Sequence, residues 1–331
     1  MVRLVPIREQ INSEYLAAFL SCKYGIAEIR CRARQSINQT NVNPEEVKEI
    51  WIPLLNSDLQ HKIKECFLKA HNLRLQANET YASAGILLLS ALGLDTHSFS
   101  TESVVVKSFS DSFCASGRLD AEYYQQKYDE LFERLSNFKC IKLGKKHVSI
   151  TKSIEPGSKC YGDVGVPFVR VSDITKFGIQ PSEVKIPMDL TDLRPHKDTI
   201  LLSKDGSIGI AYKVEKKLDC ITSSALLHLI VKSKDILPDY LTLLLNSIVV
   251  QLQAERDAGG SIIQHWKPSE IEKVIIPVLD MSIQKQITVN VQRSFALRHE
   301  SERLLESAKH AVEIAIENGE DAAMKFFKIT V

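Results

Sequence analysis

The sequence predicts an α+β protein in which one β-rich domain is combined with long helices that pair with each other. Three observations support this class. A motif near the N-terminus returns more than 220 residues later, a long apolar stripe at helical spacing follows each copy, and the β-branched runs are confined to residues 139–235. Because strands and helices are grouped rather than alternating, a doubly wound parallel sheet is not expected.

The repeated motif reads RQSINQTNVNPEEVKEIWIP at 34–53 and GGSIIQHWKPSEIEKVIIP at 259–277. Matching residues lie 225 positions apart at first and, after a gap of one residue, 224 positions apart. This constant offset indicates an internal duplication, with chance similarity of two amphipathic segments as the alternative. The matched pairs are Tyr15 with Tyr240, Leu16 with Leu241, Leu20 with Leu245, Ile37 with Ile262, Gln39 with Gln264, Pro44 with Pro268, Ile52 with Ile276, Pro53 with Pro277, Gln60 with Gln284, and Ile63 with Ile287.

Length and composition describe an ordinary globular protein. A chain of 331 residues suggests about two domains, and 44% apolar with 25% charged residues is a typical balance. The net charge of +1 means that any polyanion must bind a local patch. Seven cysteines without a CxxC pair indicate reduced thiols. With no signal-peptide pattern and no apolar run near the roughly 20 residues of a membrane span, a cytoplasmic protein is expected.

Two long helices are expected at 57–93 and 282–318. The first has a capping-box spacing between Ser57 and Gln60 and a stop signal at Gly93, and the second stops near Gly319. A helix of about 35 residues is about 50 Å long, too long for a compact core. Coiled coils of either direction fit the stripes, as do two unrelated surface helices, and we adopt an antiparallel coiled coil. The stripes comprise Leu59, Ile63, Phe67, Ala70, Leu73, Ala77, Tyr81, Ala84 and Leu88, and Ile283, Ile287, Val291, Phe295, Leu304, Ala308, Ala311 and Ala315.

One complete globular unit separates the first long helix from the second motif. It begins with a short amphipathic helix carrying Tyr124, Tyr128, Leu131 and Leu135, and it continues with the strand-like runs HVSI, PFVRVSDI, TILLS, IGIAYKV and ITSSALLHLIV. The Asp-Gly pair within 204–209 predicts a hairpin turn, and helix resumes at Pro238. The N-terminal copy holds only the counterpart of residues 236–281, so its strand-rich half is missing.

Several segments in order resemble the specificity (S) subunits of type I restriction-modification systems. They are RLDAEYYQQKYDELF (118–132), KSIEPGSKCYGDVGVPFVRVSDITKFGI (152–179), LLSKDGSIGIAYKV (201–214), ITSSALLHLIV (221–231), PDYLTLLLNS (238–247) and GGSIIQHWKPSEIEKVIIPV (259–278). The resemblance covers 118–317, and the repeat extends it to 11–92. It implies two target-recognition domains separated by paired spacer helices, each domain reading half of a bipartite DNA site.

The resemblance also implies boundaries for this chain, whose first recognition domain is truncated. We assign 1–56 to the partial first target-recognition domain, 57–93 to the first spacer helix, 94–117 to a linker, 118–281 to the complete target-recognition domain, 282–318 to the second spacer helix and 319–331 to a tail. The fold expected is thus one complete recognition domain, a remnant of a second at the N-terminus, and an antiparallel coiled coil.

The function implied is a non-catalytic subunit that recognises a DNA sequence and directs methyltransferase and restriction subunits to it. The expected partners are double-stranded DNA, two methyltransferase (M) subunits, restriction (R) subunits, and a second S chain or fragment that supplies the missing half-domain. No membrane partner is expected. No cofactor is expected in this chain; the methyltransferase would use S-adenosylmethionine, and the restriction subunit ATP and magnesium.

A local excess of lysine gives independent support for DNA binding. Residues 137–160 hold six lysines against one acidic residue, Glu155, a local charge of +5. Such a patch can neutralise phosphates but cannot specify sequence, and a solvated lysine-rich face is the alternative. The residues nominated from this patch are Lys139, Lys142, Lys145, Lys146 and Lys152.

Base reading is assigned to side chains in predicted turns. Gln can pair with adenine through two hydrogen bonds, and Arg or Lys with guanine. Trp266 could stack on a base or anchor the motif to its own domain. The candidate base-reading residues are Arg170, Ser172, Lys176, Lys204, Ser207, Gln264, His265 and Lys267.

Two other functions fit parts of the sequence. A magnesium-dependent nuclease would use a loose acidic cluster, Asp173 with Glu183 and Lys185 or Asp205 with Glu215 and Lys217. A helical scaffold without DNA would use the long helices for assembly alone. We expect neither a catalytic nor a metal-binding residue in this chain.

Overall fold

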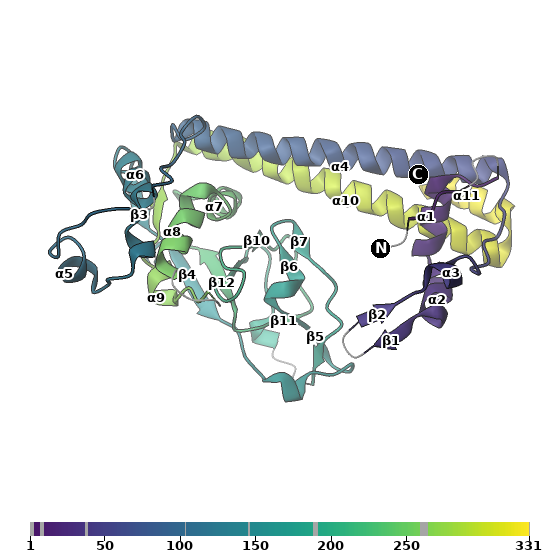
Figure 1. The fold of residues 1–331 in the computed structure, drawn as a ribbon. Helices are drawn as coiled ribbons and strands as arrows, with labels where there is room; N and C mark the ends of the chain where they lie inside the picture. Colours follow the sequence, from purple (N-terminus) through teal and green to yellow (C-terminus); the bar gives the residue numbers. More distant parts are fainter. Residues whose placement is uncertain are drawn as a thin grey trace. The chain divides into compact units, whose positions relative to one another are not determined.

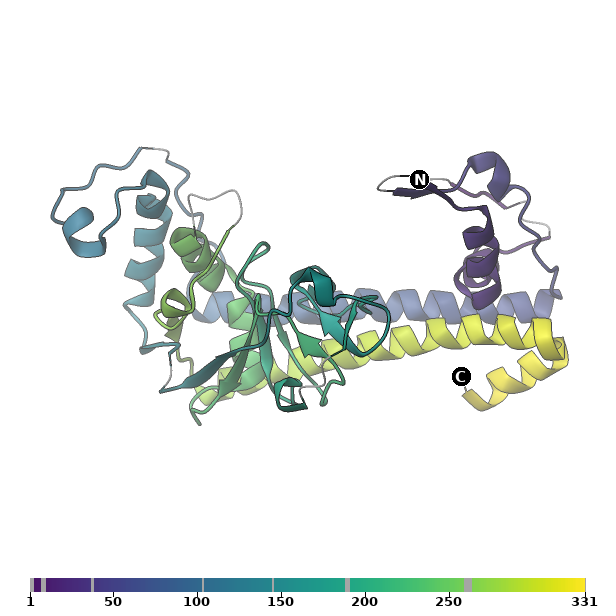
Figure 2. The same ribbon diagram turned by 90° about the horizontal axis from the view of Figure 1, so that it is seen from below.

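The computed structural model describes residues 3–6, 10–36, 39–102, 104–144, 146–187, 191–258 and 264–330 (Figures 1 and 2). The chain divides into two compact units. The terminal unit comprises Met1–Glu79 and Arg293–Val331, and the central unit comprises Thr80–Gln292. None of the described helices is both long enough and apolar enough to cross a membrane.

The terminal unit is built around the two long helices, which are present where they were predicted. Helix α4 spans Ser57–Ala91 and α10 spans Met281–Asn318, so each passes from one unit into the other. The smaller elements are α1 (Ser13–Ser21), α2 (Lys23–Arg32), the antiparallel hairpin β1 (Arg34–Ser36) and β2 (Gln39–Asn41), α3 (Pro44–Val47) and α11 (Glu320–Thr330). Its core joins α1 and α11 to the long helices through buried residues that include Tyr15, Phe19, Leu59, Ile63, Ala308, Val312 and Phe327.

The long helices pair antiparallel in the terminal unit, which confirms the predicted direction. The Ser294 hydroxyl of α10 donates to the Ala77 carbonyl of α4 over 2.7 Å. The Ser301 hydroxyl donates to the Ala70 carbonyl over 2.8 Å. A step of seven residues forward on one helix therefore matches a step of seven backward on the other, and both views draw the helices side by side (Figures 1 and 2). Small side chains at these positions let a hydroxyl reach the opposite backbone.

The start of α4 differs from the capping box that was predicted. The cap is Asn56, whose side-chain oxygen accepts from the Leu59 amide over 2.8 Å. Gln60 is not available for a capping box, because its amide group donates to the carbonyls of Leu55 and Gln10. The predicted stop is confirmed: Gly93 adopts a φ of +64°, and the Leu94 amide reaches back to the Leu89 carbonyl.

The central unit contains the strand-rich region and the helices around it. Its main sheet has the order β10-β9-β12-β4 with antiparallel neighbours, and a smaller sheet has the order β11-β5-β8. The pairs β13-β3 and β6-β7 complete the strands. The bounds are β3 (Cys140–Lys142), β4 (Val148–Lys152), β5 (Val166–Val169), β6 (Ile174–Thr175), β7 (Gly178–Ile179), β8 (Lys185–Ile186), β9 (Ile200–Ser203), β10 (Ala211–Lys213), β11 (Ile221–Thr222), β12 (Leu226–Val231) and β13 (Ile275–Pro277).

The helices of the central unit cover this strand region and lead into α10. Helix α7 contacts β10, and α6 contacts α8. The bounds are α5 (Phe113–Ser116), α6 (Gln126–Leu135), α7 (Pro238–Leu245), α8 (Ile248–Ala258) and α9 (Pro268–Ile271), with short 3-10 turns η1 (Ala121–Tyr124), η2 (Ser158–Cys160), η3 (Val171–Asp173) and η4 (Thr191–Leu193). Strands β9 and β10 form the hairpin predicted around Asp205 and Gly206, with Leu202 opposite Ala211.

Three local expectations need correction. Tyr124 lies in the 3-10 turn η1, so the buried stripe of the short helix begins at Tyr128. The helix expected from Pro238 onward is interrupted after Leu245, where the Asn246 side chain bonds the backbone of Ala211 on β10. Residues expected to form a tail are the helix α11, which buries Ala323 and Phe327.

The internal duplication is confirmed element by element. At an offset of 225, α1 and α2 correspond to α7 and α8, and at 224, α3 corresponds to α9 and α4 to α10. Even side-chain contacts repeat. The Tyr15 hydroxyl donates to the Pro53 carbonyl, as the Tyr240 hydroxyl does to Pro277.

A glutamine forms the same three bonds at the start of each long helix. Gln284 donates to the carbonyls of Leu279 and Asp235 and accepts from the Leu237 amide. Gln60 repeats these bonds with Leu55, Gln10 and Asn12. Three bonds repeated at matching offsets make chance similarity an insufficient explanation.

Candidate nucleic-acid interface

The lysines of the predicted phosphate-binding patch lie on and beside the first two strands of the central unit. Lys139 precedes β3, Lys142 belongs to β3, Lys146 lies in the turn after it, and Lys152 ends β4. All four side chains are exposed to solvent. The fifth nominated residue, Lys145, lies outside the described residues. Exposed ammonium groups on flexible stems suit phosphate contacts, which require charge rather than fixed geometry.

The structure brings two distant sets of predicted base-reading residues together in one turn cluster. We define this cluster as Lys204, Asp205 and Ser207 of the β9-β10 hairpin with Gln264, His265 and Lys267. The Gly206 amide donates to the Gln264 carbonyl over 3.0 Å, and the Trp266 amide donates to the Lys204 carbonyl over 2.7 Å. Segments about 60 residues apart are thereby joined through their backbones.

The side chains of the turn cluster are held by a shared carboxylate. Asp205 contacts the Lys204 ammonium, and its Oδ1 lies 2.9 Å from Nδ1 of His265. Burial alone would raise the pKa of Asp205, but the bonds from Lys204 and His265 lower it below its ordinary value. His265 stays exposed, as do Ser207 and Lys267. The cluster therefore presents donors and acceptors to solvent from a fixed backbone, which is the arrangement that reading base edges requires.

A second set of predicted residues surrounds the turn η3. The Asp173 carboxylate accepts from the Arg170 amide, from the Arg170 guanidinium and from the Ser172 hydroxyl. These bonds outweigh burial and lower the pKa of Asp173. Arg170 is partly committed to this carboxylate, and Asp173 acts here as an internal acceptor. In the described part of the chain, His, Cys, Asp and Glu side chains form no cluster of three suited to a metal ion.

Lys176 is positioned by aromatic rings instead of by a carboxylate. Its ammonium lies 5.2 Å from the centroid of Tyr81 and 5.1 Å from that of Phe177. The two rings meet edge to face with centroids 4.9 Å apart. Contacts of this kind orient a cation while leaving it charged and exposed.

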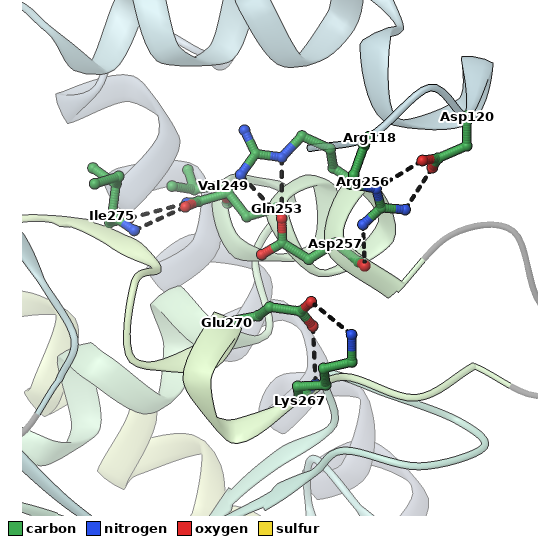
Figure 3. Close-up of polar contacts among 9 residues, drawn as sticks. All are labelled: Arg118, Asp120, Val249, Gln253, Arg256, Asp257, Lys267, Glu270 and Ile275. Carbon is green, nitrogen blue, oxygen red and sulfur yellow. Dashed lines mark hydrogen bonds and ion pairs between the residues drawn. The ribbon is translucent and has the colours of Figure 1, made fainter. Parts of the chain in front are cut away.

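A charged cluster beside Lys267 was missed by the sequence reasoning (Figure 3). The guanidinium groups of Arg118 and Arg256 lie 4.5 Å and 4.9 Å from the centroid of Tyr123. Arg118 also bonds the Asp120 carboxylate and donates to the Asp257 carbonyl over 3.0 Å. Arg118 and Asp257 lie 139 positions apart in the sequence. The segment RLDAEYY could have indicated a site here, but the sequence could not show which residues its charged side chains contact.

This charged cluster holds the end of α8, where Arg118 and Arg256 both contact Asp257. Burial raises the pKa of Asp257, an effect that the neighbouring Arg256 partly offsets. The Gln253 side chain ties α8 to β13 by accepting from the Ile275 amide over 2.8 Å and donating to its carbonyl over 3.0 Å (Figure 3). Trp266 is 1% exposed, so it serves as the anchor of its motif and not as a base-stacking platform.

The solved structures that match the chain include S subunits of type I systems, each at low sequence identity. The HsdS subunit from Thermoanaerobacter tengcongensis is 14% identical, with 98% of this chain and 72% of that chain covered and a TM-score of 0.38. The S subunit of a type I restriction-modification system from M. genitalium is also 14% identical, with 96% and 73% covered and a TM-score of 0.41. No curated protein matches the chain.

A family comparison decides the identity of the central segment. Residues 145–300 match the model described as the type I restriction modification DNA specificity domain. Residues 145–300 form a type I restriction-modification DNA specificity domain. The match confirms the resemblance on which the sequence was interpreted, and it includes both the turn cluster and the η3 set. Specificity subunits of this family are generally non-catalytic.

Proposed function

We propose that the chain is the sequence-specific DNA-recognition subunit of a type I restriction-modification complex. The observation that carries the proposal is the match of residues 145–300 to the DNA specificity domain. Residues 118–281 would be the complete target-recognition domain and 1–56 the partial one. Residues 57–93 and 282–318 would be the spacer helices, with 94–117 as linker.

We assign different roles to the two groups of residues within the recognition domain. Exposed lysines of β3, β4 and the turn between them would neutralise phosphates and position the duplex. The turn cluster, the η3 set and Lys176 would then meet base edges, because their backbones are fixed and their side chains end in hydrogen-bonding groups. This arrangement is our proposal for how one half-site is read.

The proposed partners are those of such a complex. The outer faces of the coiled coil would bind methyltransferase subunits, two in a complete assembly, and restriction subunits would join them. The chain would direct these enzymes without a reaction or cofactor of its own, S-adenosylmethionine belonging to the methyltransferase and ATP with magnesium to the restriction subunit. A second S chain or fragment would supply the missing half-domain.

Salt-dependent DNA binding tests the recognition role. Each phosphate contact contributes a slope of about −0.9 to the plot of log affinity against log salt. Lys142→Glu combined with Lys146→Glu should therefore flatten the slope by about 2 and weaken binding of random-sequence duplex. Lys285→Glu, which changes an exposed lysine on α10, should leave the slope unchanged.

Two outcomes would contradict the proposal. Equal slopes for the double variant and the control would remove the lysine patch from the interface. Cleavage of DNA by the purified chain with magnesium alone would favour a nuclease. Co-purification with a methyltransferase, followed by mapping of methylated positions in host DNA, tests the partner assignment separately.

A further inference from the structure

The β6-β7 hairpin of the central unit is a short element closed by hydrogen bonds. Its strands pair with Thr175 opposite Gly178, which leaves Lys176 and Phe177 as the two residues of the turn. The Thr175 hydroxyl accepts from the Phe177 amide over 3.2 Å and donates to the Gly178 carbonyl over 3.1 Å. The side chain of Thr175 therefore holds the tip of the hairpin to its strands.

The base of the same hairpin is joined to the η3 set of Arg170, Ser172 and Asp173. The Asp173 carbonyl accepts from the Gln180 amide over 2.7 Å, just beyond the paired strands. The Asp173 carboxylate accepts from the Arg170 amide over 3.0 Å and from the Ser172 hydroxyl over 2.9 Å. Because one residue links both parts, a movement of the hairpin also moves the proposed base-reading side chains.

The tip of the hairpin lies on the long helix α4. The ring of Phe177 meets the ring of Tyr81 edge to face, with centroids 4.9 Å apart and planes at 74°. The Lys176 ammonium lies 5.2 Å from the Tyr81 centroid and 5.1 Å from the Phe177 centroid. Tyr81 occupies a position of the apolar stripe between Ala77 and Ala84, which are both fully buried. Its ring is half-buried and serves the hairpin.

A buried ion pair ties the sheet beside the hairpin to the other long helix. Asp239 on α7 is 5% exposed and lies 2.8 Å from the Lys213 ammonium of β10. Its carboxylate also accepts from the Gln292 side chain of α10 over 3.0 Å. Strand β10 in turn contacts β6. Since breaking a buried pair is costly, this attachment is firm, and the tip is the part of the hairpin that depends on Tyr81.

We propose that Tyr81 is a positioning residue for DNA recognition, which fixes the tip of the β6-β7 hairpin on α4 and thereby the orientation of the η3 set. This inference rests on the proposed function, because it states how base-reading side chains are held. Tyr81 itself does not contact DNA. An edge-to-face pair favours the joined state by about twofold to tenfold. Loss of the ring therefore frees the hairpin without unfolding the unit.

Hydrogen exchange of the full chain measures the hold on the hairpin without DNA. Tyr81→Ala should speed exchange of the Phe177 and Gln180 amides by about twofold to tenfold, because both amides are bonded within the hairpin and its base. Tyr81→Phe keeps the ring and should leave exchange unchanged. Ile86→Ala truncates a side chain that is 63% exposed on the same helix, and it is the matched control.

Binding to two kinds of duplex separates positioning from packing. Duplexes that the wild-type chain selects from a random-sequence library provide the specific site, and an unselected duplex provides the non-specific one. Tyr81→Ala should lower the ratio of specific to non-specific affinity by about twofold to tenfold. The non-specific affinity and its salt slope should stay unchanged, because the lysine patch is intact. Tyr81→Phe should keep the wild-type ratio.

The combined results decide between the roles of Tyr81. Unchanged exchange in Tyr81→Ala would overturn the proposal, and so would faster exchange with an unchanged affinity ratio, which would reduce the contact to packing. A lower non-specific affinity would indicate that Tyr81 contacts DNA itself, which also contradicts a positioning role. If the wild-type chain selects no sequence, the proposed function fails together with the role of Tyr81 in recognition. The exchange result would still show whether the ring holds the hairpin.

Discussion

Replacement of Gln284 by Leu tests whether its three bonds hold the start of α10 to the segment before α7. The side chain is fully buried and bonds Leu279, Asp235 and Leu237. Leu fills a similar volume but leaves these backbone groups without a partner. Asp235 is exposed, so water can replace its bond. Leu237 is half-buried, so water can also reach its amide. The buried Leu279 carbonyl is left without a partner, and we expect a loss of about 1–3 kcal/mol.

The duplicated glutamine provides a matched comparison. Gln60 is 4% exposed, and of its partners Gln10 is exposed and Asn12 half-buried. Only the Leu55 carbonyl is then left without a substitute, as the Leu279 carbonyl is in the other copy, so Gln60→Leu should also cost about 1–3 kcal/mol, here in the terminal unit. Gln286→Leu, which changes an exposed position one half-turn from Gln284, should cost less than about 0.5 kcal/mol.

Urea unfolding can be followed for the central unit through one fluorophore. Trp266 is 1% exposed and changes environment on unfolding, whereas Trp51 is 86% exposed and changes little. Gln284→Leu should lower the midpoint reported by Trp266, and helical circular dichroism should report the effect of Gln60→Leu in the terminal unit. Equal midpoints for Gln284→Leu and Gln286→Leu would refute the role of the glutamine bonds.

Further predictions concern pH and packing. Burial, with a smaller contribution from His196, lowers the pKa of His228 from 6.5 to about 4. The unfolded chain therefore binds a proton at His228 more readily than the folded chain does. The free energy of unfolding should change little above about pH 6.5 and be about 2 kcal/mol lower at pH 5 than at pH 8. Urea titrations at each pH would measure this change, and His228→Gln should flatten it. Ala70 is 1% exposed opposite Ser301, so Ala70→Leu should cost about 1–3 kcal/mol by overpacking. Leu75→Ala, at a position 47% exposed, should cost under about 1 kcal/mol in the same circular dichroism measurement.

The sequence was informative wherever structure follows a local period. Both long helices, the β9-β10 hairpin and the stop at Gly93 could be predicted because spacing and turn residues are properties of neighbouring positions. The duplication could be recognised because paired prolines and glutamines kept a constant offset. Helix α11 was missed since Gly319 was taken as a final stop, although acidic residues at 320 and 321 favour a new helix start.

Features that depend on distant residues could not be predicted in the same way. The break between α7 and α8 is fixed by Asn246 bonding Ala211, 35 residues away. The stacking of Arg118 and Arg256 on Tyr123 and the carboxylate that joins Lys204 to His265 also require the folded chain. For the nominated DNA-binding residues, the structure gives position and exposure, and their contacts with DNA stay a prediction.

The N-terminal copy of the duplicated segment is stabilised by contacts with the end of α10 and with α11. The Lys23 amide bonds Glu313 over 2.9 Å, and the Tyr24 hydroxyl bonds Glu317 over 2.7 Å, so α2 is tied to α10. Glu320 at the start of α11 accepts from the Asn56 amide over 2.7 Å, beside the cap of α4.

These contacts differ from those that hold the matching helix of the central unit. In the central unit, α8 is held by Gln253 on β13 and by the Arg118 cluster, which depend on the strand-rich half. In the terminal unit, the corresponding α2 has exchanged that support for carboxylates on α10. The two copies of one sequence motif are therefore stabilised by different partners, the strand-rich region in the central unit and the long helix in the terminal unit.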